Sequence, residues 1–265
     1  MSRLRVREIE IGYDEAGSGS PVVLLHGFPF NRSMWGEQVE VLSPHFQVVA
    51  PDLRGQGETT VMLEPATMEE MARDVTALMD ALDISRAVVC GLSTGGYVAL
   101  ALCRLFPLRV RALVLADTRA GADSAEAREN REQQALQALQ EGMAPIADTM
   151  LPKLLSPGTV ANYPEIVTRV REMIIDTKPE GAASAQRGMA QRHDQTSFLS
   201  GIMEPTLIIV GREDVITPVA EAELMHREIK GSRLEVIEDA GHISNLEQPR
   251  SFNRVLLEFL RDLES

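Results

Sequence analysis

The chain has 265 residues, of which 44% are hydrophobic and 25% are charged. That composition is typical of globular proteins, and the length suits one large domain or one domain with an insertion. With 26 Lys and Arg against 39 Asp and Glu, the formal net charge is −13. This charge argues against nucleic acid or an anionic membrane as a partner, since both need a basic face. It also disfavours strongly anionic substrates, although a local pocket can override the net field.

The N-terminus and the two cysteines bear on where the chain resides. Residues 1–7 carry charge and lack the apolar stretch of a signal peptide, and no apolar run is long enough to span a bilayer. Cys90 and Cys103 have no metal-ligand spacing. We expect two buried thiols in a reducing compartment, not a disulfide or a metal site. The sequence therefore predicts a cytoplasmic protein with no metal and no cofactor.

The first half of the chain alternates apolar runs with amphipathic segments. Residues 4–11 alternate with a slip near Glu8 and predict an edge strand, followed by a turn cluster over 14–21. Further strands are predicted at 22–25, 46–50, 87–90 and 112–116, and helices at 31–42, 67–82 and 95–106. Thr67 is expected to cap its helix, with Glu70 completing a capping box. This order is typical of a parallel sheet with crossover helices.

Residues 119–200 interrupt this alternation, because no convincing strand occurs there. Helices are predicted over 123–142, around 146–151, after Pro164 and from Pro179 to 191. We therefore expect a helical insertion over 120–200 within a core formed by 1–119 and 201–265. Five methionines lie in or beside the insertion: Met143, Met150, Met173, Met189 and Met203. Either a Met-rich lid over an apolar pocket or plain packing on the core explains them.

The alternation of strand and helix resumes after the insertion. Strands are predicted at 205–210 and 233–237, a helix at 218–229, and a terminal helix from Pro249. The sequence thus predicts an α/β domain whose parallel sheet is completed by its C-terminal third.

A serine stands at the sharpest turn that the sequence predicts. Gly91-Leu92-Ser93-Thr94-Gly95 lies between the predicted strand 87–90 and the helix 95–106, and it matches G-x-S-x-G, the nucleophile elbow. A serine at so tight a turn can reach substrate only if its neighbours lack bulk. The N–H groups of the following helix favour developing negative charge. Ser93 is therefore the candidate nucleophile.

Two further candidates follow later strands. Asp214 comes after the strand at 205–210 and His242 after the strand at 233–237, so both are expected at the same edge of the sheet as Ser93. A serine needs a base to take its proton, and the base needs an anion to orient it. The chain order Ser, Asp, His is the order known for this architecture. Asp117 also ends a strand and stays an alternative to Asp214.

Other polar residues near strand ends are interpreted as structural. His26 is expected to brace its loop through hydrogen bonds, and Asp52 and Arg54 are expected to be salt-bridged turn residues. The remaining histidines are interpreted as surface or packing residues: His45, His193 and His226.

Five short stretches form a pattern when they are taken together: His26-Gly27-Phe28-Pro29, Asp52-Leu53-Arg54-Gly55-Gln56-Gly57, Gly91-Leu92-Ser93-Thr94-Gly95-Gly96, Gly211-Arg212-Glu213-Asp214 and Ala240-Gly241-His242. In this pattern the chain resembles the α/β-hydrolase superfamily over nearly its full length. The resemblance implies Ser93 as the nucleophile, His242 as general base and then acid, and Asp214 as the orienting acid.

The same resemblance implies the rest of the fold and site. It implies an α/β-hydrolase fold, with a mostly parallel central sheet, helices on both faces and an inserted helical lid near 120–200. It also implies an oxyanion hole formed by the backbone N–H groups of Phe28 and Thr94. Many related enzymes carry methionine after the nucleophile, where this chain has Thr94. The backbone donor is unaffected, whereas pocket polarity and substrate fit differ.

Within the superfamily, the chain is similar to small bacterial carboxylesterases, and also to 3-oxoadipate enol-lactonases and cofactor-free haloperoxidases. Haloalkane dehalogenases have aspartate at the nucleophile position, so Ser93 argues against that activity. We expect hydrolysis of small to medium carboxylic esters through an acyl-enzyme on Ser93, with a small-molecule ester as the partner. Enol-lactone hydrolysis, peracid formation on the same residues and a non-catalytic small-molecule receptor are the alternatives.

Overall fold

The computed structural model describes residues 2–264 and places one sheet at the centre of the chain. Its strands are β1 (Ser2–Val6), β2 (Ile9–Ala16), β3 (Pro21–Leu25), β4 (Gln47–Pro51), β5 (Ala87–Leu92), β6 (Val110–Ala116), β7 (Thr206–Gly211) and β8 (Arg233–Ile237). They are ordered β1-β2-β4-β3-β5-β6-β7-β8. The pairs from β4 to β8 are parallel, whereas β2 pairs antiparallel with both β1 and β4. The predicted mostly parallel α/β sheet is confirmed.

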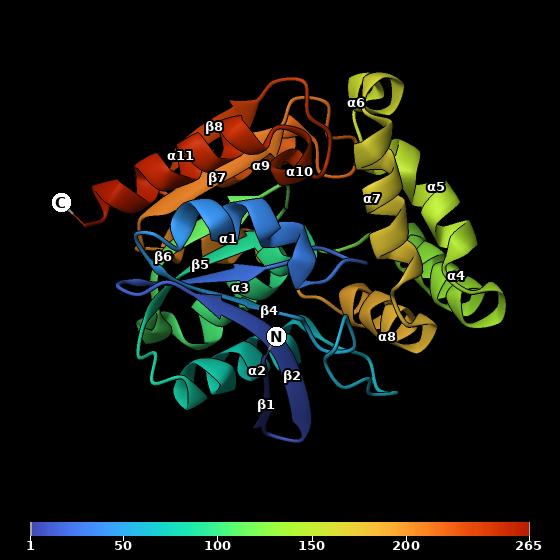
Figure 1. Ribbon diagram of the computed structural model, residues 1–265, viewed down its shortest axis with the longest axis horizontal. Helices are drawn as coiled ribbons and strands as arrows, with labels where there is room; N and C mark the ends of the chain where they lie inside the picture. The colour runs from blue at the N-terminus through green and yellow to red at the C-terminus, as the bar shows by residue number, and fades with distance from the viewer. Residues whose placement is uncertain (1, 265) are drawn as a thin grey trace.

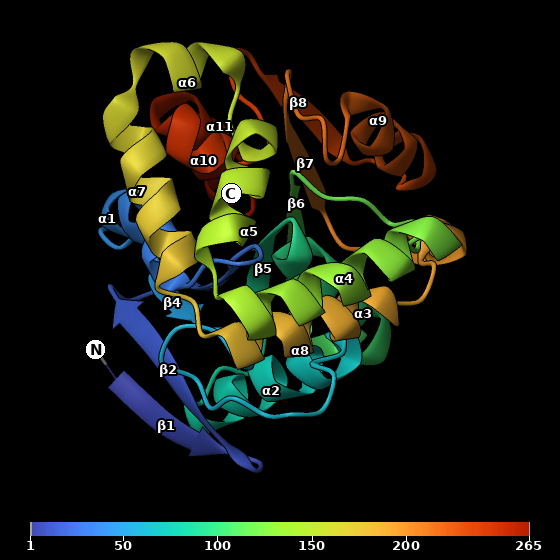
Figure 2. The ribbon, with the colours of Figure 1, turned by 90° about the vertical axis from the view of Figure 1, so that its right-hand side faces the viewer.

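Helices cover both faces of this sheet. They are α1 (Gly36–Leu42), α2 (Met68–Ala81), α3 (Thr94–Leu105), α9 (Val219–Glu228) and α11 (Pro249–Asp262). Helices α1 and α11 cover one face, and α2, α3 and α9 cover the other (Figures 1 and 2). Strands β5 and β7 are buried along their whole length. Burial on both faces explains why their sequences are continuous apolar runs.

Between β6 and β7 the chain forms five α-helices: α4 (Ala125–Glu141), α5 (Ala144–Leu154), α6 (Pro157–Asn162), α7 (Pro164–Ile175) and α8 (Pro179–Ala190). They gather at one end of the sheet, on the right of Figure 1. Ser124 caps α4 by accepting a hydrogen bond from the backbone of Ala127, and Gly142 ends it with φ of 79°. A left-handed residue after a helix is usually glycine, because other side chains are strained there.

The single strand predicted for residues 4–11 is wrong, because the chain forms a hairpin there. Strand β1 ends at Val6 and β2 begins at Ile9, and these two residues pair. Arg7 between them has φ of 52°, a left-handed conformation that reverses the chain. The slip in the alternation therefore marks a turn. Strand β2 then continues to Ala16, through the start of the predicted turn cluster, because it pairs with β4 as well as β1.

The predicted capping box at the start of α2 is only half formed. Thr67 accepts a hydrogen bond of 3.2 Å from the backbone N–H of Glu70, as predicted. The Glu70 carboxylate instead binds two arginines, Arg7 at 2.8 Å and Arg73 at 2.7 Å. These two ion pairs thus replace the expected hydrogen bond from the backbone N–H of Thr67 to the Glu70 carboxylate.

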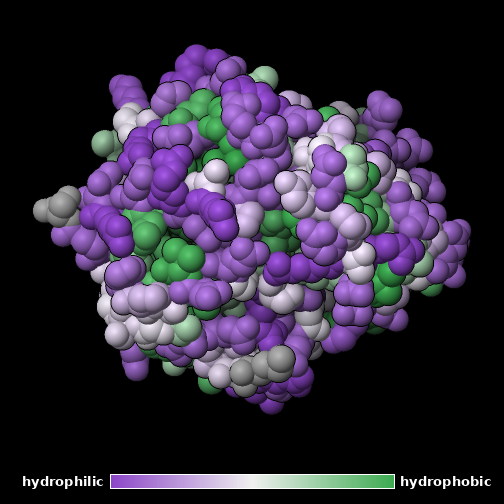
Figure 3. Space-filling view, turned by 45° about the horizontal axis from the view of Figure 1, so that its top comes forward, coloured by the Kyte–Doolittle hydropathy of each residue, from purple (hydrophilic) through white to green (hydrophobic). Residues whose placement is uncertain are grey.

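The face in Figure 3 is mostly hydrophilic, with apolar side chains exposed in separate patches. Among the described residues, no helix combines the length and the apolar character that crossing a membrane requires. Both cysteines, Cys90 and Cys103, are buried and free.

Candidate active site

Ser93 occupies a strained turn between β5 and α3. Its backbone has φ of 53° and ψ of −113°, a conformation that residues other than glycine rarely adopt. A Cβ atom on Gly91 would overlap the carbonyl of Gly95, so the turn can close this tightly only with glycine at that position. The Ser93 N–H donates to the carbonyl of Ala116 on β6 at 2.9 Å. The elbow is therefore anchored to the sheet on the side away from its hydroxyl.

The structure brings together three side chains that follow three different strands. Nε2 of His242 lies 2.8 Å from Oγ of Ser93, and Nδ1 lies 2.8 Å from Oδ2 of Asp214. All three residues are buried. With the Nδ1–H of the ring donating to the carboxylate, Nε2 is left to accept a proton from the serine hydroxyl. The three residues therefore form a continuous hydrogen-bonded chain.

The Asp214 carboxylate is held by the loop that follows it. Oδ1 accepts from the N–H groups of Ile216 at 2.8 Å and Thr217 at 2.9 Å, and the Thr217 hydroxyl donates to Oδ2 at 2.8 Å. Burial raises the pKa of Asp214, but the charge of His242 and these hydrogen bonds outweigh it, so the pKa lies below its ordinary value. Asp214 is thus kept ionised beside the imidazole.

The environment of the imidazole favours its charged form. Burial lowers the pKa of His242, but the charge of Asp214 and the hydrogen bond that the ring donates to that carboxylate outweigh burial, so the pKa is raised above its ordinary value. A ring with this balance readily accepts a proton from a neighbouring hydroxyl.

Asp117, the alternative orienting acid, lies at the end of β6 and braces its neighbours. Its Oδ1 accepts from the N–H of Gly211 at 2.8 Å, and its Oδ2 accepts from the hydroxyl of Ser244 at 2.6 Å. Among the described residues, it makes no hydrogen bond with His242. Burial, followed by the nearby charge of Asp214, raises the pKa of Asp117 to about 8. Of these two carboxylates, Asp214 is the one that is hydrogen-bonded to the ring in this structure.

A buried glutamate that the sequence analysis missed holds the loop of His242. Glu247, in the short helix α10 (Ser244–Glu247), accepts from the N–H of Gly241 at 2.7 Å and from the N–H of Ser156 at 2.8 Å. The N–H of His242 donates to the carbonyl of Leu154 at 2.9 Å. The loop is thus tied to the connection between α5 and α6. The sequence offers only one signal for this contact, a glutamate shortly after His242. That signal can be interpreted only when the fold is known.

The residues interpreted as structural are confirmed in that role. His26 is buried, with Nδ1 2.9 Å from the carbonyl of the next residue and Nε2 accepting from the N–H of Leu53 at 2.9 Å. Both nitrogens are used, so the ring braces the loop. Asp52 and Arg54 form ion pairs with residues of neighbouring segments, Arg32 and Asp74 respectively.

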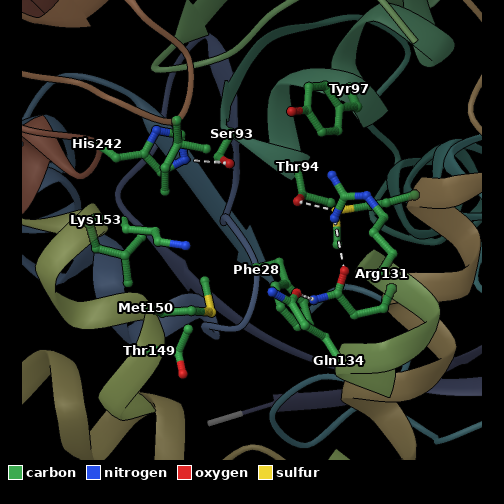
Figure 4. A pocket seen from close by; sticks show the side chains of 14 residues that line it. Phe28, Ser93, Thr94, Tyr97, Arg131, Gln134, Thr149, Met150, Lys153 and His242 are labelled. Atoms are coloured by element: carbon green, nitrogen blue, oxygen red, sulfur yellow. Dashed lines mark hydrogen bonds between the residues drawn. The ribbon is translucent and has the colours of Figure 1, made fainter. Parts of the chain in front are cut away.

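A cavity of about 190 Å³ lies beside Ser93 (Figure 4). Phe28, which follows β3, and Thr94, which begins α3, both line it. Among the described residues, the N–H of Phe28 donates to no protein acceptor. The N–H of Thr94 belongs to the first residue of a helix, where no intrahelical acceptor exists. Two residues that line the cavity thus have a backbone N–H without a partner among the described residues.

The α4–α8 helices supply the other side of the cavity. The lining residues from this segment are Arg131 and Gln134 on α4, Thr149, Met150, Lys153 and Leu154 on α5, and Gln186 and Met189 on α8. The Thr94 hydroxyl donates to the sulfur of Met189 at 3.0 Å. Met150 and Met189 line the cavity, Met143 and Met173 are buried in packing, and Met203 is 87% exposed.

Comparisons with known proteins agree with this architecture. The family model for the alpha/beta hydrolase fold matches residues 20–249. The 3-oxoadipate enol-lactonase 2 of Acinetobacter baylyi is 32% identical over 255 residues, which cover 96% of this chain and 94% of that protein.

Solved structures are similar over the full length. A thermophilic esterase from Thermogutta terrifontis, solved with malate bound, superimposes with a TM-score of 0.98 at 42% identity and covers 100% of both chains. The enol-lactonase from Burkholderia xenovorans LB400 gives a TM-score of 0.92 at 32% identity, covering 98% of this chain and 100% of that one. With the family model spanning most of its length, this chain belongs to the α/β-hydrolase family.

Proposed function

We propose that the protein is a serine carboxylesterase that hydrolyses small to medium carboxylic esters through an acyl-enzyme on Ser93. The observation that carries this proposal is the ring of His242, which is hydrogen-bonded to the Ser93 hydroxyl on one side and to the Asp214 carboxylate on the other. A serine hydroxyl is a weak nucleophile until an oriented base takes its proton. The similarity to the Thermogutta esterase supports the same activity.

The reaction follows from the geometry. His242 removes the proton from Oγ of Ser93 as that oxygen attacks the ester carbonyl. The tetrahedral oxyanion is stabilised by the N–H groups of Phe28 and Thr94, and the N-terminus of α3 adds a favourable dipole. The imidazolium then protonates the departing alcohol. In the second half, His242 activates a water molecule that hydrolyses the acyl-enzyme.

We also assign residues 120–200 as a lid over a core made of 1–119 and 201–265. The support for this division is that the cavity has the proposed nucleophile on one side and side chains of α4, α5 and α8 on the other. A roof of this kind excludes water from the acyl-enzyme and selects the substrate by its fit.

Enol-lactone hydrolysis is the second candidate, because two enol-lactonases are each 32% identical to this chain over almost its whole length. A lactone is a cyclic ester, so the same attack by Ser93 opens the ring. The released oxygen then stays attached to the acyl group.

A panel of p-nitrophenyl esters of rising acyl length, together with small lactones, tests the proposal. We expect short acyl chains to be hydrolysed best, because the cavity of about 190 Å³ is small. Ser93→Ala is expected to abolish turnover. Lactones hydrolysed much faster than any open-chain ester would assign the enzyme as a lactonase. Tight ligand binding without turnover by the wild type would contradict both enzymatic proposals.

A further inference from the structure

The cavity beside Ser93 is positively charged, although the chain as a whole has a net charge of −13. Two of its lining residues are basic, Arg131 on α4 and Lys153 on α5, and no aspartate or glutamate is among the lining residues. A cavity lined by one sign of charge attracts ligands of the opposite sign, even when the net charge of the protein repels them.

Lys153 has no counter-ion. It is one of only three lysines in the chain, and among residues 2–264 no side chain forms a hydrogen bond or an ion pair with it. Its ammonium group points into the cavity (Figure 4). Lys153 and Gln134 also line a neighbouring groove of about 620 Å³ along α4. Lys153 therefore stands where this groove meets the cavity, with its charge free to pair with a ligand.

Arg131 is fixed in place with part of its guanidinium unused. Its Nε is hydrogen-bonded to the carboxylate of Asp123, and its Nη1 donates to Oε1 of Gln186 at 2.8 Å. Among the described residues, its Nη2 donates to no protein acceptor. A guanidinium held in this way presents its remaining N–H groups at low entropic cost.

Two further arginines share the carboxylate that binds Arg131. Asp123 is shared by three arginines, because Arg119 and Arg192 also lie 2.7 Å from its Oδ1. Arg192 stacks with its guanidinium carbon 4.2 Å from the ring centre of Tyr97, which lines the cavity. Asp123 is therefore shared among these arginines, and the other carboxylates that act on them, Glu221 on Arg119 and Asp194 on Arg192, do not line the cavity.

We infer that Lys153 and Arg131 form an anion subsite, and that the substrate is an ester or lactone that also carries a carboxylate group. This inference rests on the proposed function, since it names the substrate class of the same site. A carboxylate suits the subsite better than a phosphate dianion, because the net charge of the protein repels a dianion more strongly. The general expectation that anionic substrates are disfavoured is therefore reversed inside this cavity.

The test compares esters that differ in one charge. The anionic substrates are the monomethyl esters of succinic, glutaric and adipic acids. The neutral references are the corresponding dimethyl esters, corrected for their two ester groups. The readout is the ratio of kcat/KM for each anionic ester to that of its neutral reference. We expect the wild type to prefer at least one monoester, and this preference to fall as ionic strength rises.

Variants of Lys153 assign the preference to the subsite. Lys153→Met keeps the length of the side chain and removes its charge, so the ratio is expected to fall about tenfold, the effect of losing one charge-assisted hydrogen bond. Lys153→Arg is expected to restore most of the ratio. The control is Lys230→Met, which removes the same charge from an exposed lysine outside the cavity lining and is expected to leave the ratio unchanged.

The possible failures are distinguishable. If neither type of ester is hydrolysed in a Ser93-dependent manner, the proposed function itself is wrong. If neutral esters are hydrolysed through Ser93 but the wild type shows no preference for any monoester, the anion subsite is overturned. The subsite is equally overturned if Lys153→Met and Lys230→Met change the ratio to the same extent.

Discussion

Asp214 and Asp117 follow the neighbouring strands β7 and β6, yet of the two only Asp214 is hydrogen-bonded to the ring of His242. The two oxygens of Asp117 are occupied by Gly211 and Ser244. The two carboxyl groups thus lie at similar positions beside the sheet but have different partners. Asp214 binds the imidazole, and Asp117 binds the end of β7 and the start of α10.

This difference predicts that two matched substitutions lower the rate by very different amounts. Asp214→Asn is expected to lower kcat by about 10⁴-fold, because the amide no longer fixes the ring in the required tautomer. Asp117→Asn is expected to lower kcat by far less, since Asp117 does not touch the imidazole. Steady-state kinetics with one short p-nitrophenyl ester measures both. An unchanged rate in Asp214→Asn would move the orienting role to Asp117.

The strained backbone of Ser93 predicts that stability can be gained at this position while activity is lost. Both Ser93→Ala and Ser93→Gly remove the hydroxyl, but only glycine adopts φ of 53° without strain. We expect the glycine variant to be more stable than the alanine variant by about 1 kcal/mol. Chemical denaturation of the two variants checks this. Equal stabilities would mean that the turn stores no strain.

In the proposed mechanism, the pKa of His242 sets the acid side of the activity profile. Catalysis needs the neutral ring, and Asp214 holds the pKa of His242 above its ordinary value, which is about 6.5. We therefore expect kcat/KM to fall as the pH drops, with the midpoint of that fall above pH ~6.5. In Asp214→Asn the residual activity should show its midpoint at lower pH, because the anion that favours the charged ring is gone. A wild-type midpoint well below pH ~6.5 would contradict this assignment.

Glu247 is predicted to stabilise the loop that carries His242. In Glu247→Gln the amide offers an N–H₂ group to one of the two backbone donors, Gly241 or Ser156, so that one N–H is left unpaired. We expect a loss of about 1–3 kcal/mol in the free energy of unfolding, together with a lower kcat/KM. Glu238→Gln, at an exposed carboxylate paired with Arg212, is the control and should change stability little. Equal effects of the two substitutions would contradict a special role for Glu247.

The ends of the strands can be predicted from the sequence, because they depend on the local hydrophobic pattern and on the topology of a parallel sheet. Ser93, Asp214 and His242 each follow a short apolar run, and parallel strands bring such positions to one edge. The β1–β2 hairpin could not be predicted in this way, because its turn depends on Arg7 adopting a left-handed conformation. Nothing in the side chain of an arginine signals that conformation.

The lining of the cavity could not be predicted for a different reason. Arg131 and Lys153 belong to helices whose polar residues look like an ordinary solvated face in the sequence. Only the packing of α4 against α8, and of α5 near the loop of His242, determines which of these side chains face Ser93. Those contacts join segments far apart in the chain, so periodicity within one helix does not contain them.

In the proposed lid, the hydrogen bonds that Glu247 accepts from Ser156 and Gly241 limit which part can move. The Glu247 carboxylate binds both the loop of His242 and the α5–α6 connection. An outward movement of that connection would therefore move His242 away from Ser93. In chimeric enzymes that exchange the proposed lid, residues 120–200, between relatives, residues 154–156 and 241–247 should therefore come from the same parent.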